Sequence, residues 1–182
     1  MVDNNGKREV LFSVDMEDYN HALHIVKKGY TAQESALWLL KQLSLYKIKA
    51  VVYVLGRFAE EFPDVVREFI KEGHIIGDHG HYHDYGEAQE YPFINKFYRS
   101  PYWATEKMPY PPSGGFFFRF MPYWYVKAAA EDSGVFWIHP HDIMENHPKL
   151  KNPWLNWKRH IGLKGARKKL ERLMKELKWK SM

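Results

Sequence analysis

Histidine and carboxylate side chains gather in three short stretches of the sequence, at residues 13–18 (SVDMED), 77–84 (GDHGHYHD) and 137–142 (WIHPHD). These are the side chains that bind divalent metals and that move protons during hydrolysis. The chain has no cysteine, so thiolate metal sites, cysteine nucleophiles and disulfides are all excluded. Any metal must therefore be held by His, Asp or Glu.

Asp15, Glu17 and Asp18 place three carboxylates within four residues, directly after an apolar run. Repulsion among carboxylates this close together is offset by a bound cation or a shared proton. One interpretation is therefore a metal site or a general base. The other is a helix N-cap beside solvated charges.

His79 and His83 have i, i+4 spacing. On a helix or a tight turn these positions point the same way, which suits two imidazoles that bind one ion. The spacing alone is equally typical of solvated loop histidines. Together with a nearby carboxylate it predicts a site for a divalent metal, with Zn²⁺ the leading candidate and positions left open for water. His81, between the two, is expected to point elsewhere.

Arg99 and His139 complete the set of candidate residues. Arg99 lies among aromatic residues and proline in YRSPYW. It is predicted to pair with and orient an acid of the site, the alternative being a cation–π contact on the surface. His139 follows an apolar run and precedes proline. It is a candidate general acid, and the alternative is a core histidine with a structural role.

The elements that must position these side chains alternate between strand and helix. Apolar runs at 9–15, 49–55 and 74–80 predict buried strands, and 31–48 and 61–73 predict helices. This order predicts a parallel sheet or barrel of the α/β class. The carboxyl ends of parallel strands meet at one rim, so the acids and the histidines are expected to lie together there.

Individual residues mark the expected ends of these helices. Thr31 and Glu34 have capping-box spacing at the start of the first. Pro63 fits the first turn of the second, and Gly73 fits its end.

The second half of the chain begins with a turn-rich stretch over 85–115. After it, FFFRF (116–120) is a candidate strand, 122–134 is a predicted helix, and VFWI before His139 is a predicted strand. Leucines at helical spacing predict a basic amphipathic helix near the end of the chain. We therefore divide the chain into a catalytic domain over 1–150 and this packed helix within 151–182.

Length and composition limit the remaining possibilities. The 182 residues, 45% of them hydrophobic, suit a domain with one core. No stretch approaches the roughly 18 apolar residues needed to span a bilayer, and the first ten residues lack an apolar leader, so a cytoplasmic location is expected. The net charge of +5 is concentrated near the C-terminus. We interpret it as a solvated helix face, and no nucleic-acid partner is expected.

These residues, in this order, resemble the polysaccharide deacetylase (NodB homology) family, in its branch with a first motif like SVDMEDY. FSVDMEDYN (12–20) resembles the first motif, and YVLGRFAEEFPDVVREFIKEGHIIGDHGHYH (53–83) the second motif with its preceding helix. YRSPYW (98–103) resembles the third motif, and SGGFFFRFMPYWYVKAAAEDSGVFWIHPHDI (113–143) the closing region. The resemblance covers roughly residues 8–150.

The resemblance implies a distorted (β/α) barrel with one divalent metal that removes N-acetyl groups from carbohydrates. By position, His79 and His83 correspond to metal ligands, and Arg99 to the residue that orients the base. His139 corresponds to the group that protonates the leaving amine. The implied substrate is an N-acetylated polysaccharide or glycan precursor.

The resemblance leaves two assignments for the acids. If the adjacent acid pair of the family aligns with Glu17-Asp18, Glu17 is the base and Asp18 is the metal ligand. If an Asp-x-acid variant is the better guide, Asp15 is the base and Glu17 is the ligand. Strand alternation puts Asp15 and Glu17 on one face and favours the second assignment. Asp18, just past the strand, stays a candidate ligand.

The chain departs from the family pattern in two places. His141 and Asp142 stand where this branch commonly has Trp-Glu after the His-Pro pair. The interval between YRSPYW and PPSGGFFFRF is much shorter than in relatives, which predicts either an abbreviated or open barrel or a stretch that is missing from this sequence. Two alternative functions follow: an allantoinase-like hydrolase of small amides with the same fold, and an inactive scaffold that binds a glycan or a partner.

Overall fold

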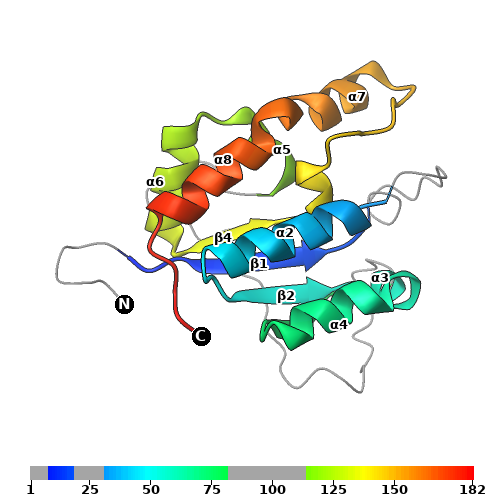
Figure 1. Cartoon of the computed structure of the whole chain (residues 1–182). Helices are drawn as coiled ribbons and strands as arrows, with labels where there is room; N and C mark the ends of the chain where they lie inside the picture. The colour runs from blue at the N-terminus through cyan, green and yellow to red at the C-terminus, as the bar shows by residue number, and fades with distance from the viewer. Residues whose placement is uncertain (1–7, 19–30, 82–113) are drawn as a thin grey trace.

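A four-stranded parallel sheet forms the centre of the protein (Figure 1). The computed structural model describes residues 8–18, 31–81 and 114–182. Within them the strand order is β3-β2-β1-β4. The strands are β1 (Leu11–Met16), β2 (Ala50–Val54), β3 (Ile75–Asp78) and β4 (Val135–Ile138). All run in the same direction, so their carboxyl ends lie at one edge, as the sequence predicts.

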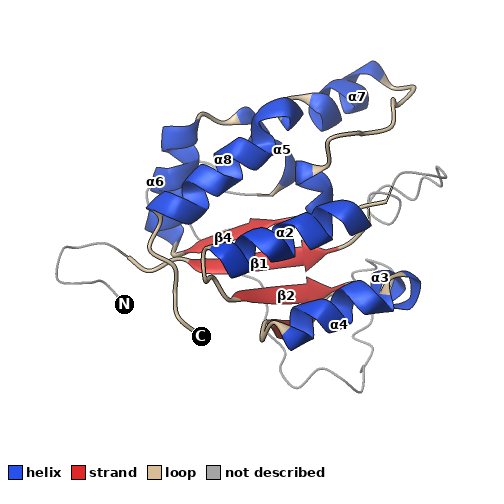
Figure 2. Cartoon of the chain, viewed as in Figure 1, coloured by secondary structure: helices blue, strands red, loops and turns tan. Residues whose placement is uncertain are grey.

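Helices connect and cover these strands (Figure 2). Between β1 and β3 lie α2 (Gln33–Leu45), α3 (Gly56–Glu61) and α4 (Pro63–Lys71). Around β4 lie α5 (Gly115–Phe120), α6 (Tyr123–Ser133) and the 3₁₀ helix η1 (Pro140–Ile143). The chain ends with α7 (Pro153–His160) and α8 (Leu163–Glu176).

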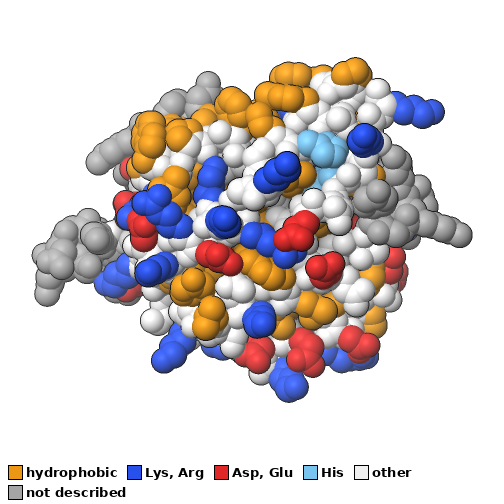
Figure 3. All heavy atoms as spheres, turned by 45° about the horizontal axis from the view of Figure 1, so that its top comes forward, with side chains coloured by type: hydrophobic (Ala, Val, Ile, Leu, Met, Phe, Trp, Pro, Cys, Tyr) orange, Lys and Arg blue, Asp and Glu red, His pale blue; other side chains and the backbone are white. Residues whose placement is uncertain are grey.

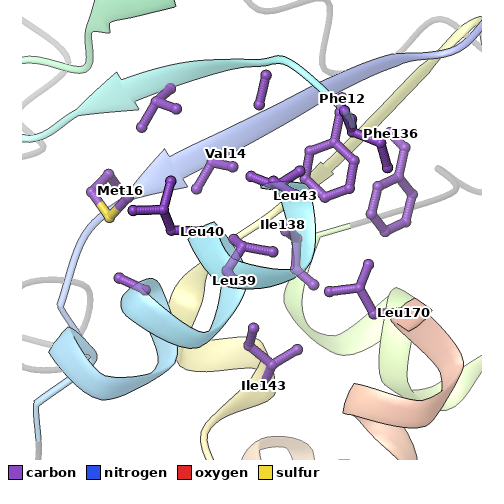
Figure 4. Packing of buried hydrophobic residues seen from close by; sticks show 14 of the residues in the cluster. Phe12, Val14, Met16, Leu39, Leu40, Leu43, Phe136, Ile138, Ile143 and Leu170 are labelled. Atoms are coloured by element: carbon purple, nitrogen blue, oxygen red, sulfur yellow. The ribbon is translucent and has the colours of Figure 1, made fainter. Parts of the chain in front are cut away.

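One hydrophobic core joins the sheet to its helices. Side chains from β1, β4, α2 and α8 meet in it, as the close view of Phe12, Leu39 and Leu170 illustrates (Figure 4). Phe12 and Phe136 pack edge to face across the β1–β4 pair, with ring centroids 5.5 Å apart. This packing fixes β4 beside β1, and it thereby places the residue after β4 next to the residues after β1.

Two local predictions are wrong. FFFRF is the helix α5 and not a strand, because Phe118 and the neighbouring Arg119 are both buried while Phe120 is exposed, a pattern that strand alternation does not give. The capping box from Thr31 does not form: α2 has Ala32 as its N-cap and no side-chain cap. Its amide N–H is instead bound by Asp18, a residue distant in sequence.

The C-terminal region holds two helices where the sequence suggested one. The predicted leucine stripe is buried in α8, where Leu170 and Leu173 have no exposed surface. After α8 the chain returns to the sheet, and Val10 forms a parallel bridge with Trp179. Among the described residues, no helix is both long enough and apolar enough to cross a membrane.

The architecture is α/β, with a parallel sheet that stays open over the described residues. This agrees with the predicted abbreviated, open form of the barrel. Parallel pairing aligns Met16 at the end of β1 with Val54 of β2. The polar residues that follow the strands are therefore brought to a common rim.

Candidate active site

The acids at the end of β1 lie at this rim and are buried. Asp15, Glu17 and Asp18 are each no more than 2% exposed. The interpretation of these acids as solvated surface charges is therefore wrong. Burial of an ionised carboxylate is costly unless cations or hydrogen-bond donors surround it, so these acids must be matched by their neighbours.

His139 is one such neighbour. Its Nε2 atom lies 3.4 Å from Glu17 Oε1 and 4.0 Å from Asp15 Oδ2. The position follows from the sheet, because His139 is the first residue after β4 and β4 pairs with β1. His139 and the two acids come from separate stretches of the sequence. In the fold they meet, and one ring nitrogen of His139 faces the carboxylates of Glu17 and Asp15.

The other ring nitrogen of His139 is held by Asp142. Its Nδ1 lies 2.8 Å from Asp142 Oδ2, the same oxygen that accepts the His139 backbone N–H at 3.1 Å. Both residues belong to one turn around η1. The carboxylate fixes the ring orientation and leaves Nε2 directed at Glu17 and Asp15.

Asp142 is in turn anchored by α5. Its Oδ2 accepts the Gly115 N–H at 2.9 Å, and its Oδ1 accepts a hydrogen bond from the Arg119 guanidinium. Both partners of this ion pair are almost completely buried. Arg119 also donates to the backbone carbonyls of Lys158 and Ile161, at 3.1 and 3.3 Å, which ties α7 to the site.

The charges around His139 determine its protonation. Burial by itself lowers the pKa of the ring, but the carboxylates of Asp142, Glu17 and Asp15 outweigh burial and raise the pKa of His139 to about 9. The ring is therefore a cation at neutral pH. A protonated Nε2 beside two buried carboxylates is suited to deliver a proton.

His141 stacks on His139 but has a different charge state. The two rings are 4.5 Å apart and nearly parallel. Burial, followed by the positive His139 ring, lowers the pKa of His141 to about 3, so His141 is neutral. Arg159 Nη1 lies 3.4 Å from its Nε2. A guanidinium can only donate, so Nε2 is the acceptor and the ring proton is on Nδ1, 4.0 Å from Glu17 Oε1.

The first histidine after β3, His79, reaches the same rim. His79 Nε2 lies 4.0 Å from Glu17 Oε2, and the His79 backbone N–H donates to Val54 O at the end of β2. His81 turns away, as predicted, with its Nε2 3.9 Å from Glu60 Oε2 on α3. His83 and Arg99 lie outside the described residues.

Asp18 is used differently from the other two acids. Its Oδ2 accepts the Ala32 N–H at 2.9 Å at the start of α2. By contrast, Glu17 has contacts to both His79 and His139.

The donor set at the rim fits a divalent metal. Glu17, His139 and His141 each offer a ligand atom, and these atoms lie within 4.8 Å of one another. His79 offers Glu17 another imidazole partner, because its Nε2 lies 4.0 Å from Glu17 Oε2. Glu17 with His79 leaves the His139 proton in place.

Sequence reasoning missed Arg119 as a site residue and noted Asp142 only as a departure from the family pattern. A signal for Arg119 was present, because a single charge inside the aromatic run FFFRF needs a buried partner. For Asp142 the signal was the His-x-x-Asp spacing directly after a strand, which is the spacing of a capping box.

Two family models match parts of the chain. The polysaccharide deacetylase family matches residues 19–116. The chain belongs to the polysaccharide deacetylase family. A second family, a domain of unknown function (DUF3473), matches residues 88–182 and so includes the part that carries Arg119, His139 and Asp142.

Individual relatives are similar over part of their length. A peptidoglycan-N-acetylglucosamine deacetylase of Bacillus cereus is 30% identical over 96 residues, covering 38% of this chain and 35% of the relative. An uncharacterized 30.6 kDa protein of Geobacillus stearothermophilus, from the fumA 3' region, is 33% identical over 57 residues, covering 31% of this chain and 20% of that protein. This polysaccharide deacetylase family member thus spans about a third or less of the curated relatives it matches.

Among solved structures, the Bc1960 peptidoglycan N-acetylglucosamine deacetylase superposes with a TM-score of 0.51. The match covers 96% of this chain and 86% of that chain at 17% identity. At this identity the match establishes the fold, and it supports the predicted deacetylase-type α/β architecture.

Proposed function

We propose that the protein is a hydrolase that removes the N-acetyl group from an amino sugar of a polysaccharide or glycan precursor. The observation that carries the proposal is the position of His139, a charged ring whose Nε2 faces Glu17 and Asp15 while Asp142 holds its Nδ1. Amide hydrolysis needs a base to activate water and an acid to protonate the departing amine. Family membership and the deacetylase relatives support the substrate class.

We assign the base to Asp15 and the carboxylate ligand of a divalent metal to Glu17. The contact of Glu17 with His79 favours this assignment. Asp18 then acts as a structural acceptor at the start of α2. His79 is the described imidazole ligand, and the family resemblance adds His83 as the second.

A bound divalent ion, with Zn²⁺ the leading candidate, would polarise the acetyl carbonyl and lower the pKa of a water molecule. The chain supplies the proton transfers. Asp15 takes a proton from the attacking water, the C–N bond breaks, and His139 gives its Nε2 proton to the nitrogen that leaves. The products are acetate and a free amino sugar. The assignment of Arg99 as the residue that orients Asp15 rests on the family resemblance alone.

The proposal is tested by incubating metal-loaded protein with an N-acetylglucosamine oligomer and measuring acetate and free amine together. Equal amounts of both products, lost on chelation and restored by added metal, would support it. Turnover of small ureides or amides with no action on the oligomer would favour the allantoinase-like alternative. Protein that binds the oligomer but releases no acetate would favour the inactive scaffold.

A further inference from the structure

The helix α7 has two contrasting sides. Inward, its last turn is tied to the catalytic cluster: Arg159 contacts His141, and the Lys158 carbonyl accepts a hydrogen bond from Arg119. Outward, α7 exposes Trp154 by 62%, Leu155 by 42% and Trp157 by 41%, and no residue of the helix is buried. Hydrophobic burial therefore does not explain why these side chains are apolar.

The exposed side chains of α7 continue onto α5. Trp154 stacks on Trp157 with ring centroids 5.0 Å apart, and Trp157 contacts Phe116 and Phe120 at 5.8 and 6.1 Å. Phe120 is itself 48% exposed. We call Phe116, Phe120, Trp154, Leu155 and Trp157 the α5–α7 patch. A contiguous apolar surface of this kind usually marks an interaction site.

The stretch of sequence that contains α7 carries charge of one sign. Residues 146–170 contain no Asp or Glu. Lys158 Nζ lies 5.6 Å from the centre of the Phe116 ring, and Lys151, Lys164 and Lys168 are exposed. Figure 3 shows hydrophobic side chains over the α7 end of the molecule with Lys and Arg side chains beside them. The surface is complementary to a partner that is both apolar and anionic.

We propose that the α5–α7 patch docks the protein onto an anionic membrane surface. Tryptophan at the boundary between water and lipid, with lysine reaching the headgroups, is the composition that interfacial helices use. A glycan fits the patch less well, because stacking within the pairs Trp154–Trp157 and Phe116–Phe120 already covers one face of each ring. The cavity of about 480 Å³ beside His147 is lined by none of these rings.

The connection through Arg119 gives the docking a functional consequence. Arg119 contacts both Asp142 of the catalytic cluster and the carbonyls of Lys158 and Ile161 at the end of α7. The patch is therefore held in a fixed orientation relative to His139. Docking would present the site in a constant direction to glycans near the membrane, while hydrolysis of a soluble oligomer would not require it.

Co-sedimentation of the full chain with phospholipid vesicles tests the proposal. We expect binding to vesicles of phosphatidylglycerol mixed with phosphatidylcholine, weak binding to phosphatidylcholine alone, and a decline as ionic strength rises. The double variant Trp154→Ser/Trp157→Ser should bind the anionic vesicles at least about tenfold more weakly than the wild type. Lys151→Ala should weaken binding about fivefold. Trp124→Ser, which removes a 66% exposed tryptophan on α6, is the matched control and should bind as the wild type does.

Three outcomes would overturn the proposal. The first is wild-type protein that does not bind the anionic vesicles at physiological ionic strength, and the second is a double variant that binds them unchanged. The third is evidence that the patch binds something else. The wild type would bind an N-acetylglucosamine polymer, or self-associate in light scattering, and the double variant would lose that interaction while it still binds vesicles. Acetate release from a soluble oligomer should be the same in all these variants, so failure of the docking proposal is separable from failure of the proposed activity.

Discussion

His139 Nδ1 lies 2.8 Å from Asp142 Oδ2, and the same carboxylate is bound by the buried Arg119 guanidinium. One ion pair thus sets both the orientation and the charge of the ring that faces Glu17 and Asp15. Nearby cations hold the pKa of Asp142 well below its usual range despite burial, so this carboxylate stays negative and keeps His139 protonated. The ion pair of Asp142 with Arg119, together with the Asp142–His139 contact, keeps His139 protonated so that it can act as an acid.

Asp142→Asn should shift the pH dependence of turnover. Asn keeps the shape but removes the negative charge, so the pKa of His139 should fall from about 9 toward lower values. Because His139 acts in its protonated form, the falling limb of the profile should move to lower pH. Profiles of kcat/KM against pH for the wild type and the variant measure this. Asp64→Asn, which changes an exposed acid on α4, is the control and should leave the limb in place.

Arg119→Met should destabilise the protein strongly. It leaves the buried Asp142 carboxylate without its guanidinium, and breaking a buried pair in this way costs about 3–5 kcal/mol. The matched control is Arg67→Met, since Arg67 pairs with Asp64 at 2.6 Å on the surface, where such pairs contribute about 1 kcal/mol or less. Urea unfolding of both variants gives the comparison. Equal, small losses in the free energy of unfolding would mean that the Arg119–Asp142 pair does not stabilise the fold.

Glu17→Gln and Asp18→Asn should differ in metal content. Glu17 contacts His79 and is the proposed ligand, whereas Asp18 accepts a backbone N–H at the start of α2. We expect Glu17→Gln to lose metal and activity together, and Asp18→Asn to keep metal with some loss of stability. Metal stoichiometry of the purified variants decides. Metal lost only from Asp18→Asn would restore the assignment of Asp18 as the ligand.

Stability should decline on the acid side of neutrality. Burial, aided by the nearby Lys49 ammonium, lowers the pKa of His74 to about 4, and burial lowers the pKa of His147 to about 4 as well. The unfolded chain binds these protons near pH 6.5, whereas the folded protein resists them until about pH 4. The stabilisation is thus complete above about pH 6.5 and is lost as pH falls toward 4.

The His74 contribution can be isolated. His74 Nδ1 accepts the Ala50 N–H at 3.1 Å, and an Asn side chain in its place keeps an acceptor but does not titrate. Thermal melts should show a smaller loss of Tm between neutral and mildly acid pH for His74→Asn than for the wild type. A parallel loss in both proteins would assign the acid sensitivity to other groups.

The sequence was sufficient to predict that several candidate residues meet at one edge of the sheet, because that prediction rests on the geometry of parallel strands. Glu17, His79 and His139 each follow a strand of the same parallel sheet, and parallel strands end at one rim. The same reasoning could not give the arrangement within the site. That Glu17 faces His79 while Asp18 turns to Ala32 depends on side-chain packing after β1, which strand alternation describes only up to Met16.

Short helices were the weaker part of the prediction. In α5 the aromatic residues of FFFRF are typical of strands, yet tertiary contacts of Arg119 determine the outcome. The helix α7 carried a readable signal, since Asn152 caps it through the Leu155 N–H and Pro153 occupies its first turn. Its exposed tryptophans obscured that signal, because they do not form a buried stripe.

Acetate release by His139→Ala, measured beside its metal content, tests the proposed mechanism most directly. His139 is assigned to proton delivery and not to metal binding, so the variant should keep metal. Its turnover of an N-acetylglucosamine oligomer should fall on the order of 10²- to 10⁴-fold, the range for removing a general acid. A folded, metal-loaded His139→Ala protein with near-normal acetate release would contradict the mechanism, and so would loss of metal together with activity.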